Sequence, residues 1–225
     1  MLAAMDAAGI ERAIACPVKP YDYDLRAANE IVAEAVAATG GRLTGVARVD
    51  PLRGDAARRD LAYALDELGL RGLFLHPWEE TYRIADRVVD RVVEPAGERG
   101  LPVIVAAGYP LLSEALQVSA LARRFPEVTF IATNGLQLNI SGLGQIDAEL
   151  ALAEADNLLL QTAGVYREDF LEGVVRRFGA ERMLFASSYP LLDPRLEIKR
   201  VEWASFADAD RVLLLGANAE RVFRT

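Results

Sequence analysis

Short apolar runs recur along the chain at nearly even intervals, with longer segments of mixed polarity between them. Successive runs begin 25 to 31 residues apart. The seven runs begin at Arg12, Leu43, Gly72, Pro102, Val128, Asn157 and Arg182. Because such an interval accommodates one strand, one crossover helix and two loops, the pattern predicts seven consecutive βα units.

The runs are continuously apolar rather than alternating, for example over residues 73–75 and 103–105. Strands of this kind are buried on both faces, which is typical of a parallel sheet. The segments between the runs carry apolar side chains at helical spacing, as expected for helices that lie on a sheet. The first such stripe consists of Leu25, Ala28, Ile31, Val32 and Ala35.

Seven units of near-equal length, with no linker rich in Pro, Gly or Ser, favour a single TIM-type (β/α)8 barrel over residues 1–225. One of the eight strands is missing. The chain starts with an expected helix, Leu2 to Ala8, which ends at Gly9 and leads into what would be the second strand. We expect either a first strand upstream of Met1 or a gap whose strand edges are covered by something else.

Composition narrows the possible functions. The chain has 225 residues, 52% of them hydrophobic, which suits one large packed core and excludes disorder. A net charge of −8 and basic clusters no longer than a pair argue against nucleic acid as a partner. The single cysteine, Cys16, fits a reducing compartment, and no apolar run approaches a membrane span. We therefore expect a cytoplasmic protein.

The chain has few side chains that could ligate zinc, because it contains one histidine, His76, and one cysteine. Zinc sites draw on several His, Cys or carboxylate ligands at once. A metal would thus need oxygen ligands or a partner chain, and we expect no cofactor.

A βα barrel builds its site at the carboxyl ends of its strands, and here those ends are short of ionisable groups. Asp50 ends one run. Arg48 lies two residues earlier, on the same face of the strand, which predicts an ion pair between the two. His76 ends the next run, and Glu79 and Glu80 after it are expected to be solvated. Tyr109 follows the run that begins at Pro102.

The later strand ends carry amides and hydroxyls. Thr133 and Asn134 open a loop that runs to Asn139 and is expected either to line a pocket or to cap its own backbone. Ser188 follows the last run. Because Ser188 and His76 end strands on opposite sides of a barrel, we expect no serine–histidine pair. Residues 141–144 form a weak anion-binding motif ahead of a helix.

Several strings of residues resemble the amidohydrolase superfamily, in order along nearly the whole chain. They span residues 5–13, 45–51, 72–77, 101–105 and 184–190, followed by residues 216–219. The closer resemblance is to the branch of decarboxylases and hydrolases related to aminocarboxymuconate semialdehyde decarboxylase. It implies an amidohydrolase-like barrel and is less specific for chemistry.

In that family a metal is held by a His-x-His pair on the first strand, by His at the ends of the fifth and often the sixth, and by Asp at the end of the eighth. The resemblance places the last three positions on Ala106, Thr133 and Ser188. It therefore implies a degenerate member that lacks the metal ligands. Metal-free relatives similar to the lactonase of pyrone dicarboxylate are expected to keep the eighth-strand Asp, so Ser188 departs from them too.

The resemblance implies a barrel that binds a small organic carboxylic ligand at its C-terminal mouth. The expected ligand contacts are Thr133, Asn134, Ser188, Tyr109 and Asp50, with His76 as the candidate catalytic residue. One alternative is an active metal-independent hydrolase or decarboxylase with His76 as acid or base. Another is a non-catalytic subunit, or a homo-oligomer, whose partner covers the open barrel edge.

Overall fold

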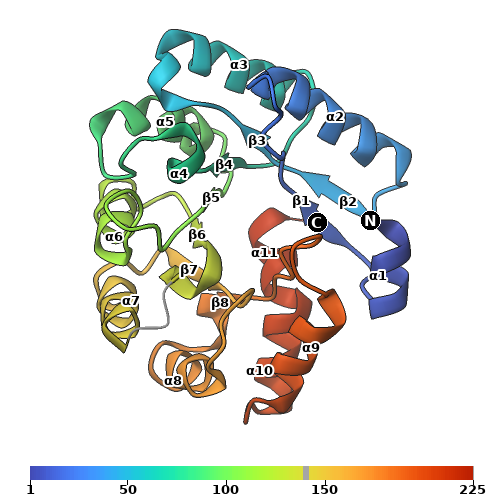
Figure 1. Cartoon of the computed structure of the whole chain (residues 1–225), viewed down its shortest axis with the longest axis vertical. Coiled ribbons are helices and arrows are strands. Elements are labelled where there is room, and N and C mark those ends of the chain that lie inside the picture. The colour runs from blue at the N-terminus through green and yellow to red at the C-terminus, as the bar shows by residue number, and fades with distance from the viewer. Residues whose placement is uncertain (139–141, 225) are drawn as a thin grey trace.

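Short parallel strands form a curved ladder with helices around its outside (Figure 1). The computed structural model describes residues 1–138 and 142–224. The strands are β1 Ala13–Ala15, β2 Leu43–Gly45, β3 Ala47–Arg48, β4 Leu73–Leu75, β5 Val103–Val105, β6 Phe130–Ala132, β7 Leu158–Gln161 and β8 Met183–Leu184.

Helices follow the strands in alternation. The α-helices are α1 Leu2–Ala8, α2 Leu25–Ala38, α3 Asp55–Asp66, α4 Pro77–Glu80, α5 Asp90–Glu98, α6 Ala115–Arg124, α7 Gly142–Glu154, α8 Glu168–Phe178, α9 Pro194–Trp203, α10 Asp208–Val212 and α11 Asn218–Phe223. Short 3-10 turns cover Pro51–Arg53, Arg87–Val89, Thr133–Leu136 and Ala180–Arg182, and a π-helical turn covers Leu213–Ala217. Among these described helices, none is both long and apolar enough to cross a bilayer.

Each of the seven predicted apolar runs contains a strand, and the run that begins at Leu43 contains two, β2 and β3. β2 pairs with β1, and β3 pairs with β4. Between them, the Val46 N–H donates to the Ala15 carbonyl at 3.0 Å. The ladder then continues in chain order from β4 to β8, always parallel. The expected TIM-type α/β architecture is confirmed.

Alternate positions on each strand belong to two different apolar clusters. Leu73 and Leu75 pack outward against the helices, whereas Phe74 between them packs into the barrel interior. The buried interior cluster consists of Val46, Phe74, Ile104, Ala106, Ile131, Leu159, Leu184 and Phe223. The next inward position toward the carboxyl end of β4 is His76, which therefore lies at the mouth.

Strands β1 and β8 are the two ends of the ladder, and within the described residues no strand pairs with their outer edges. Helix α11 lies between them (Figure 1). Its Phe223 belongs to the interior cluster, and its Glu220 pairs with Arg12 at the start of β1. The C-terminal helix of the chain thus fills part of the gap where a further barrel strand would lie.

The stripe predicted for α2 is wrong at one position. Ile31 is 65% exposed, whereas Asn29 is 1% exposed. The Asn29 amide donates to the Arg48 carbonyl at 2.9 Å and accepts the Arg48 N–H at 2.8 Å. Those two bonds join α2 to β3. The buried face of α2 therefore includes Asn29, a polar residue that apolar periodicity does not predict.

Candidate functional site

Arg48 is the buried centre of the polar network at the barrel mouth. It is paired with Phe74 in the β3–β4 register, and its guanidinium lies 5.4 Å from the centroid of the Phe74 ring. The residue is 1% exposed. Because a buried guanidinium needs counter-charges, its partners decide what the site can do.

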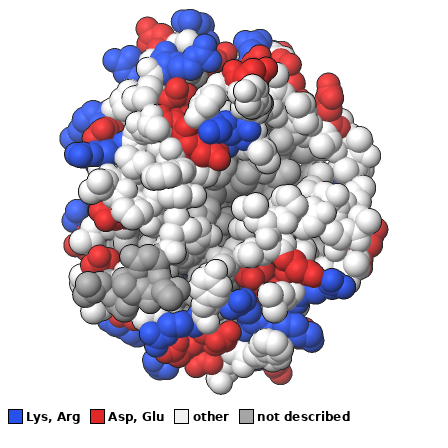
Figure 2. Space-filling model, in the orientation of Figure 1, with Lys and Arg blue, Asp and Glu red and all other residues white. Residues whose placement is uncertain are grey.

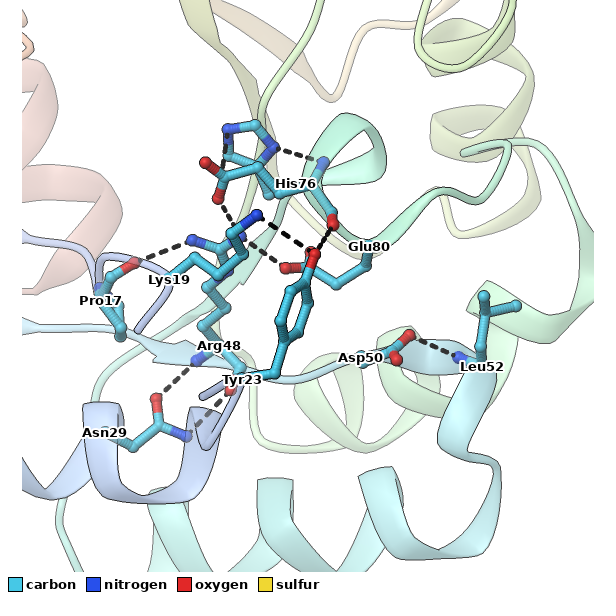
Figure 3. A network of polar contacts seen from close by, with 10 residues as sticks. Pro17, Lys19, Tyr23, Asn29, Arg48, Asp50, Leu52, His76 and Glu80 are labelled. Carbon is cyan, nitrogen blue, oxygen red and sulfur yellow. Dashed lines mark hydrogen bonds and ion pairs between the residues drawn. The ribbon is translucent and has the colours of Figure 1, made fainter. Parts of the chain in front are cut away.

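Those partners are Glu79 and Glu80 of α4 (Figure 3). Arg48 Nη2 donates to Glu79, and it donates to Glu80 Oε1 at 2.5 Å. Nη1 donates to the Pro17 carbonyl at 3.2 Å. The expectation that the two glutamates are solvated is wrong for Glu80, which is 4% exposed, whereas the Glu79 side chain is 30% exposed.

Helix α4 returns the glutamates to the strand end because it begins directly after β4. His76 is its N-cap and Pro77 its first residue, a position that suits the fixed φ of proline. A single helical turn then carries residues three and four positions later back over His76. The sequence signal for this turn is His76-Pro77, which the expectation of solvated glutamates overlooked.

Burial raises the pKa of Glu80 to about 7, although the Arg48 guanidinium opposes the rise. Its Oε2 is buried and makes no hydrogen bond with any residue that the structure describes. Burial and the neighbouring Glu80 also raise the pKa of the buried Tyr82 hydroxyl. Glu80 therefore exchanges a proton near neutral pH in the folded chain.

His76 is held between α4 and the aromatic side chains of the mouth. Its Nδ1 accepts the Glu79 backbone N–H at 3.3 Å, and its Nε2 lies 3.9 Å from Glu79 Oε2. Burial lowers the pKa of His76 to about 4, with Glu79 opposing that shift and Arg48 and Lys19 adding to it. The imidazole is thus neutral at physiological pH.

Three aromatic rings meet at this edge of the mouth. Trp78 stacks on Tyr109 with ring centroids 5.6 Å apart and planes 11° apart. The Tyr109 ring also contacts His76, at 5.5 Å between centroids. Trp78 is 57% exposed, so one face of the stack remains available. The structure therefore brings the predicted residues His76 and Tyr109 together and adds Trp78.

The loop after β1 closes over the same network. The Tyr23 hydroxyl donates to the Glu79 carbonyl, and Lys19 Nζ donates to the Tyr23 hydroxyl at 3.2 Å. The Lys19 ammonium also lies 4.6 Å from the centroid of the Tyr23 ring. Lys19 is thus a cation at the mouth whose hydrogen-bond donors are only partly used by the described residues.

Asp50 does not form the predicted ion pair with Arg48, which pairs with the two glutamates instead. One Asp50 carboxylate oxygen accepts the Leu52 N–H at 2.9 Å and caps the 3-10 turn over Pro51–Arg53. Asp50 still lies close enough to raise the pKa of Glu80. A ligand contact by Asp50 remains a prediction.

Ala106 and Thr133 lie beside each other at the ends of β5 and β6. Ala106 belongs to the apolar interior cluster and is 4% exposed. The Thr133 hydroxyl accepts the Ala107 N–H at 3.0 Å, which joins the two strand ends. A methyl group offers no lone pair, and a neutral hydroxyl is a weak ligand, so these side chains do not fit a divalent metal site. Within residues 1–138 and 142–224, no three His, Cys, Asp or Glu side chains gather in a metal-binding arrangement.

The other predicted contacts lie further around the rim. Asn134 and Ser188 both have left-handed backbone conformations, with φ of 54° and 47°. Gln137 and Leu138, from the same loop as Asn134, line a cavity of about 30 Å³ together with residues 164–167, which has room for little more than water. Asn139, the last residue of the predicted loop, and the start of the 141–144 motif lie outside the described residues.

Figure 2 shows the mouth face hollowed near its centre. The surface around the hollow is mostly uncharged, and acidic and basic side chains gather above it and below it in this view. The fold therefore presents one mouth with an aromatic and charged edge at β4 and β5.

These features define the class of the protein, a parallel βα barrel with its polar groups at the carboxyl ends of the strands. A family model described as amidohydrolase matches residues 3–225. The chain belongs to the amidohydrolase family. A comparison with curated protein sequences finds no match.

Solved structures support the fold. The chain is similar to 5-carboxyvanillate decarboxylase from Sphingomonas paucimobilis, with a TM-score of 0.80 and 18% identity over 100% of this chain and 82% of that one. It is similar to 2,6-dihydroxybenzoate decarboxylase from Rhizobium, with a TM-score of 0.75 and 20% identity over 99% and 87% of the two chains. An uncharacterised TIM-barrel protein from Bordetella bronchiseptica gives a TM-score of 0.81 and 21% identity over 100% and 81%. At these identities the likeness establishes the fold alone.

Proposed function

We propose that this amidohydrolase-type barrel binds a small organic carboxylic acid at its C-terminal mouth without a resident divalent metal. The observation that carries the proposal is the Trp78–Tyr109 stack beside His76, which offers a partly exposed aromatic face next to polar groups. Aromatic side chains of this kind bind a flat apolar body while neighbouring groups fix its orientation.

The two basic side chains at the mouth indicate where the carboxylate of a ligand would bind. Arg48 is already paired with two glutamates, so it has little charge left to offer a ligand. Lys19 is the nearby cation whose described contact is with a neutral hydroxyl, that of Tyr23. In the proposal Lys19 meets the ligand carboxylate, and Thr133, Asn134, Ser188 and Asp50 complete the rim as predicted contacts.

The names of two similar structures support the ligand class. Those proteins are decarboxylases of 5-carboxyvanillate and 2,6-dihydroxybenzoate, both carboxylic acids. The absence of a metal in the proposal rests on Ala106 and Thr133, whose side chains do not supply metal ligands.

Intrinsic tryptophan fluorescence tests the proposal, because the chain has only Trp78 and Trp203. Benzoate should change the emission in a saturable way, and a chelator should leave the titration unchanged. The response should persist in Trp203→Phe, since Trp203 is 68% exposed on α9, and should disappear in Trp78→Phe. A response that follows Trp203, or a requirement for added divalent metal, would overturn the proposal.

A further inference from the structure

We propose that His76 is fixed as a neutral donor through Nε2–H, and that it forms with Glu79 Oε2 a donor–acceptor pair that binds one hydroxyl group. The hydroxyl belongs to the bound ligand or, in its absence, to a water molecule. The ligand part of this inference rests on the proposed function, whereas the state of His76 stands independently.

The tautomer follows from the hydrogen bond at Nδ1. The Glu79 backbone N–H donates in a bifurcated bond, to the His76 carbonyl at 3.0 Å and to His76 Nδ1 at 3.3 Å, and a backbone amide only donates. Nδ1 must therefore carry the lone pair, and the proton of a neutral imidazole lies on Nε2. Since the same bond caps α4, the ring orientation is part of the local fold (Figure 3).

The distance between His76 Nε2 and Glu79 Oε2 indicates what binds between them. At 3.9 Å the two atoms are too far apart for a direct hydrogen bond. An oxygen atom at ordinary hydrogen-bond distance, about 2.8 Å, from both fits this gap. A hydroxyl there accepts from Nε2–H and donates to Glu79 Oε2, which neither a carboxylate nor an ether oxygen does.

Glu79 is positioned for this role by Arg48 and Tyr23. Arg48 Nη2 donates to Glu79 Oε2, and the Tyr23 hydroxyl donates to the Glu79 backbone carbonyl. Burial raises the pKa of Glu79, but the hydrogen bond and charge of Arg48, with the charge of Lys19, lower it overall, so the carboxylate stays an acceptor. Glu79 is therefore a positioning residue for His76 and a contact for the hydroxyl.

The groups facing His76 come from every neighbouring element. They are Glu79 of α4, Arg48 of β3, Lys19 after β1, Tyr109 after β5 and the Phe74 ring of β4. Burial, Arg48 and Lys19 disfavour a second proton on the ring, whereas the Glu79 carboxylate and the His76 backbone favour one. A general base at this position would need a free lone pair at the mouth, and the only lone pair of the ring is the one that caps α4.

Nitrogen-15 NMR tests the inference directly, because His76 is the only histidine in the sequence and gives the only imidazole signals of the untagged chain. We expect an unprotonated Nδ1 and a protonated Nε2, unchanged from about pH 8 to about pH 6. A protonated Nδ1, or an imidazolium already present at about pH 6, would overturn the assignment.

Phenol and benzoate separate the two parts of the inference. Phenol should move the Nε2–H signal more than benzoate does, and Glu79→Gln should weaken that response while leaving Nδ1 unprotonated, since the backbone amide remains. If benzoate alone moves the signal, the pair does not bind a hydroxyl. If neither probe moves it although benzoate changes Trp78 emission, the site holds water only and the ligand hydroxyl is ruled out, while the proposed function survives.

Discussion

Arg48 illustrates how one buried charge organises the mouth. It lies on an otherwise apolar strand, and its two carboxylate partners are 31 and 32 residues further along the chain. A buried guanidinium must be paired, and that requirement was visible in the sequence. The sequence did not show which carboxylates pair with Arg48. Asp50 lies two residues after Arg48, on the same face of the strand, and was the predicted partner, but in the structure it caps the 3-10 turn that follows.

Replacing Arg48 by Met should be strongly destabilising, because it leaves Glu79 and the buried Glu80 without their counter-charge. We expect a loss of roughly 3–5 kcal/mol in the free energy of unfolding, measured by urea denaturation. Arg12→Met is the matched control: its ion pair with Glu220 is about half exposed and should be worth less than about 1 kcal/mol. Equal losses in the two variants would contradict the role given to Arg48.

Glu80 should make stability fall with rising pH. Its pKa is raised from 4.5 to about 7 on folding, so the folded chain binds more protons than the unfolded chain between those values. The favourable contribution of protonated Glu80 is present at low pH and is lost as the pH rises through about 7. Glu80→Gln removes this dependence.

The measurement is the unfolding free energy of both chains at about pH 6 and about pH 8. The stability of the wild type should fall relative to Glu80→Gln by roughly 1–2 kcal/mol over that range. The lowered pKa of His76 makes stability fall toward acid in both chains and largely cancels in the difference. Parallel curves would show that Glu80 is ionised throughout.

At the scale of elements, the apolar runs predicted the strands because a buried parallel strand has a recognisable pattern. The short α4 was not predicted, since one helical turn has no apolar period to detect. Its effect is large, because it places both glutamates at the strand end. The grouping of Trp78 with Tyr109 likewise depends on how two loops pack, which residue spacing does not specify.

Gly108 lets the loop after β5 pack closely against the loop that contains Leu138. Its φ is +89°, and a Cβ there would lie 2.6 Å from the Leu138 backbone nitrogen in the neighbouring loop. Gly108→Ala should therefore cost about 2–3 kcal/mol of stability and weaken benzoate binding, because Tyr109 follows directly. Thermal unfolding and the Trp78 titration measure the two effects.

Gly69→Ala is the control for the backbone conformation alone. Gly69 has a φ of +70°, and no described atom lies within 4 Å of the place that a Cβ would take, so only the left-handed strain of about 1 kcal/mol applies. Benzoate binding should be unaffected in this variant. If both variants lose stability equally and bind benzoate normally, the contact between the two loops does not position Tyr109.

At the scale of the whole molecule, the even spacing of seven runs predicted the barrel and its incomplete ladder. The position of α11 between β8 and β1 was not predictable from spacing, because it depends on Phe223 packing into the interior from the far end of the chain. The family match establishes the architecture, whereas chemistry on this fold is set by individual side chains. The predicted homo-oligomer remains a prediction that a subunit count would test.

Native mass spectrometry of the untagged chain with benzoate tests the central claim most directly, because one spectrum reports bound metal, bound ligand and subunit number together. We predict a chain without stoichiometric zinc or manganese that gains one benzoate, and loss of that adduct in Trp78→Ala. A stoichiometric divalent metal, or a benzoate adduct unaffected by Trp78→Ala, would contradict metal-free binding at the aromatic edge of the mouth.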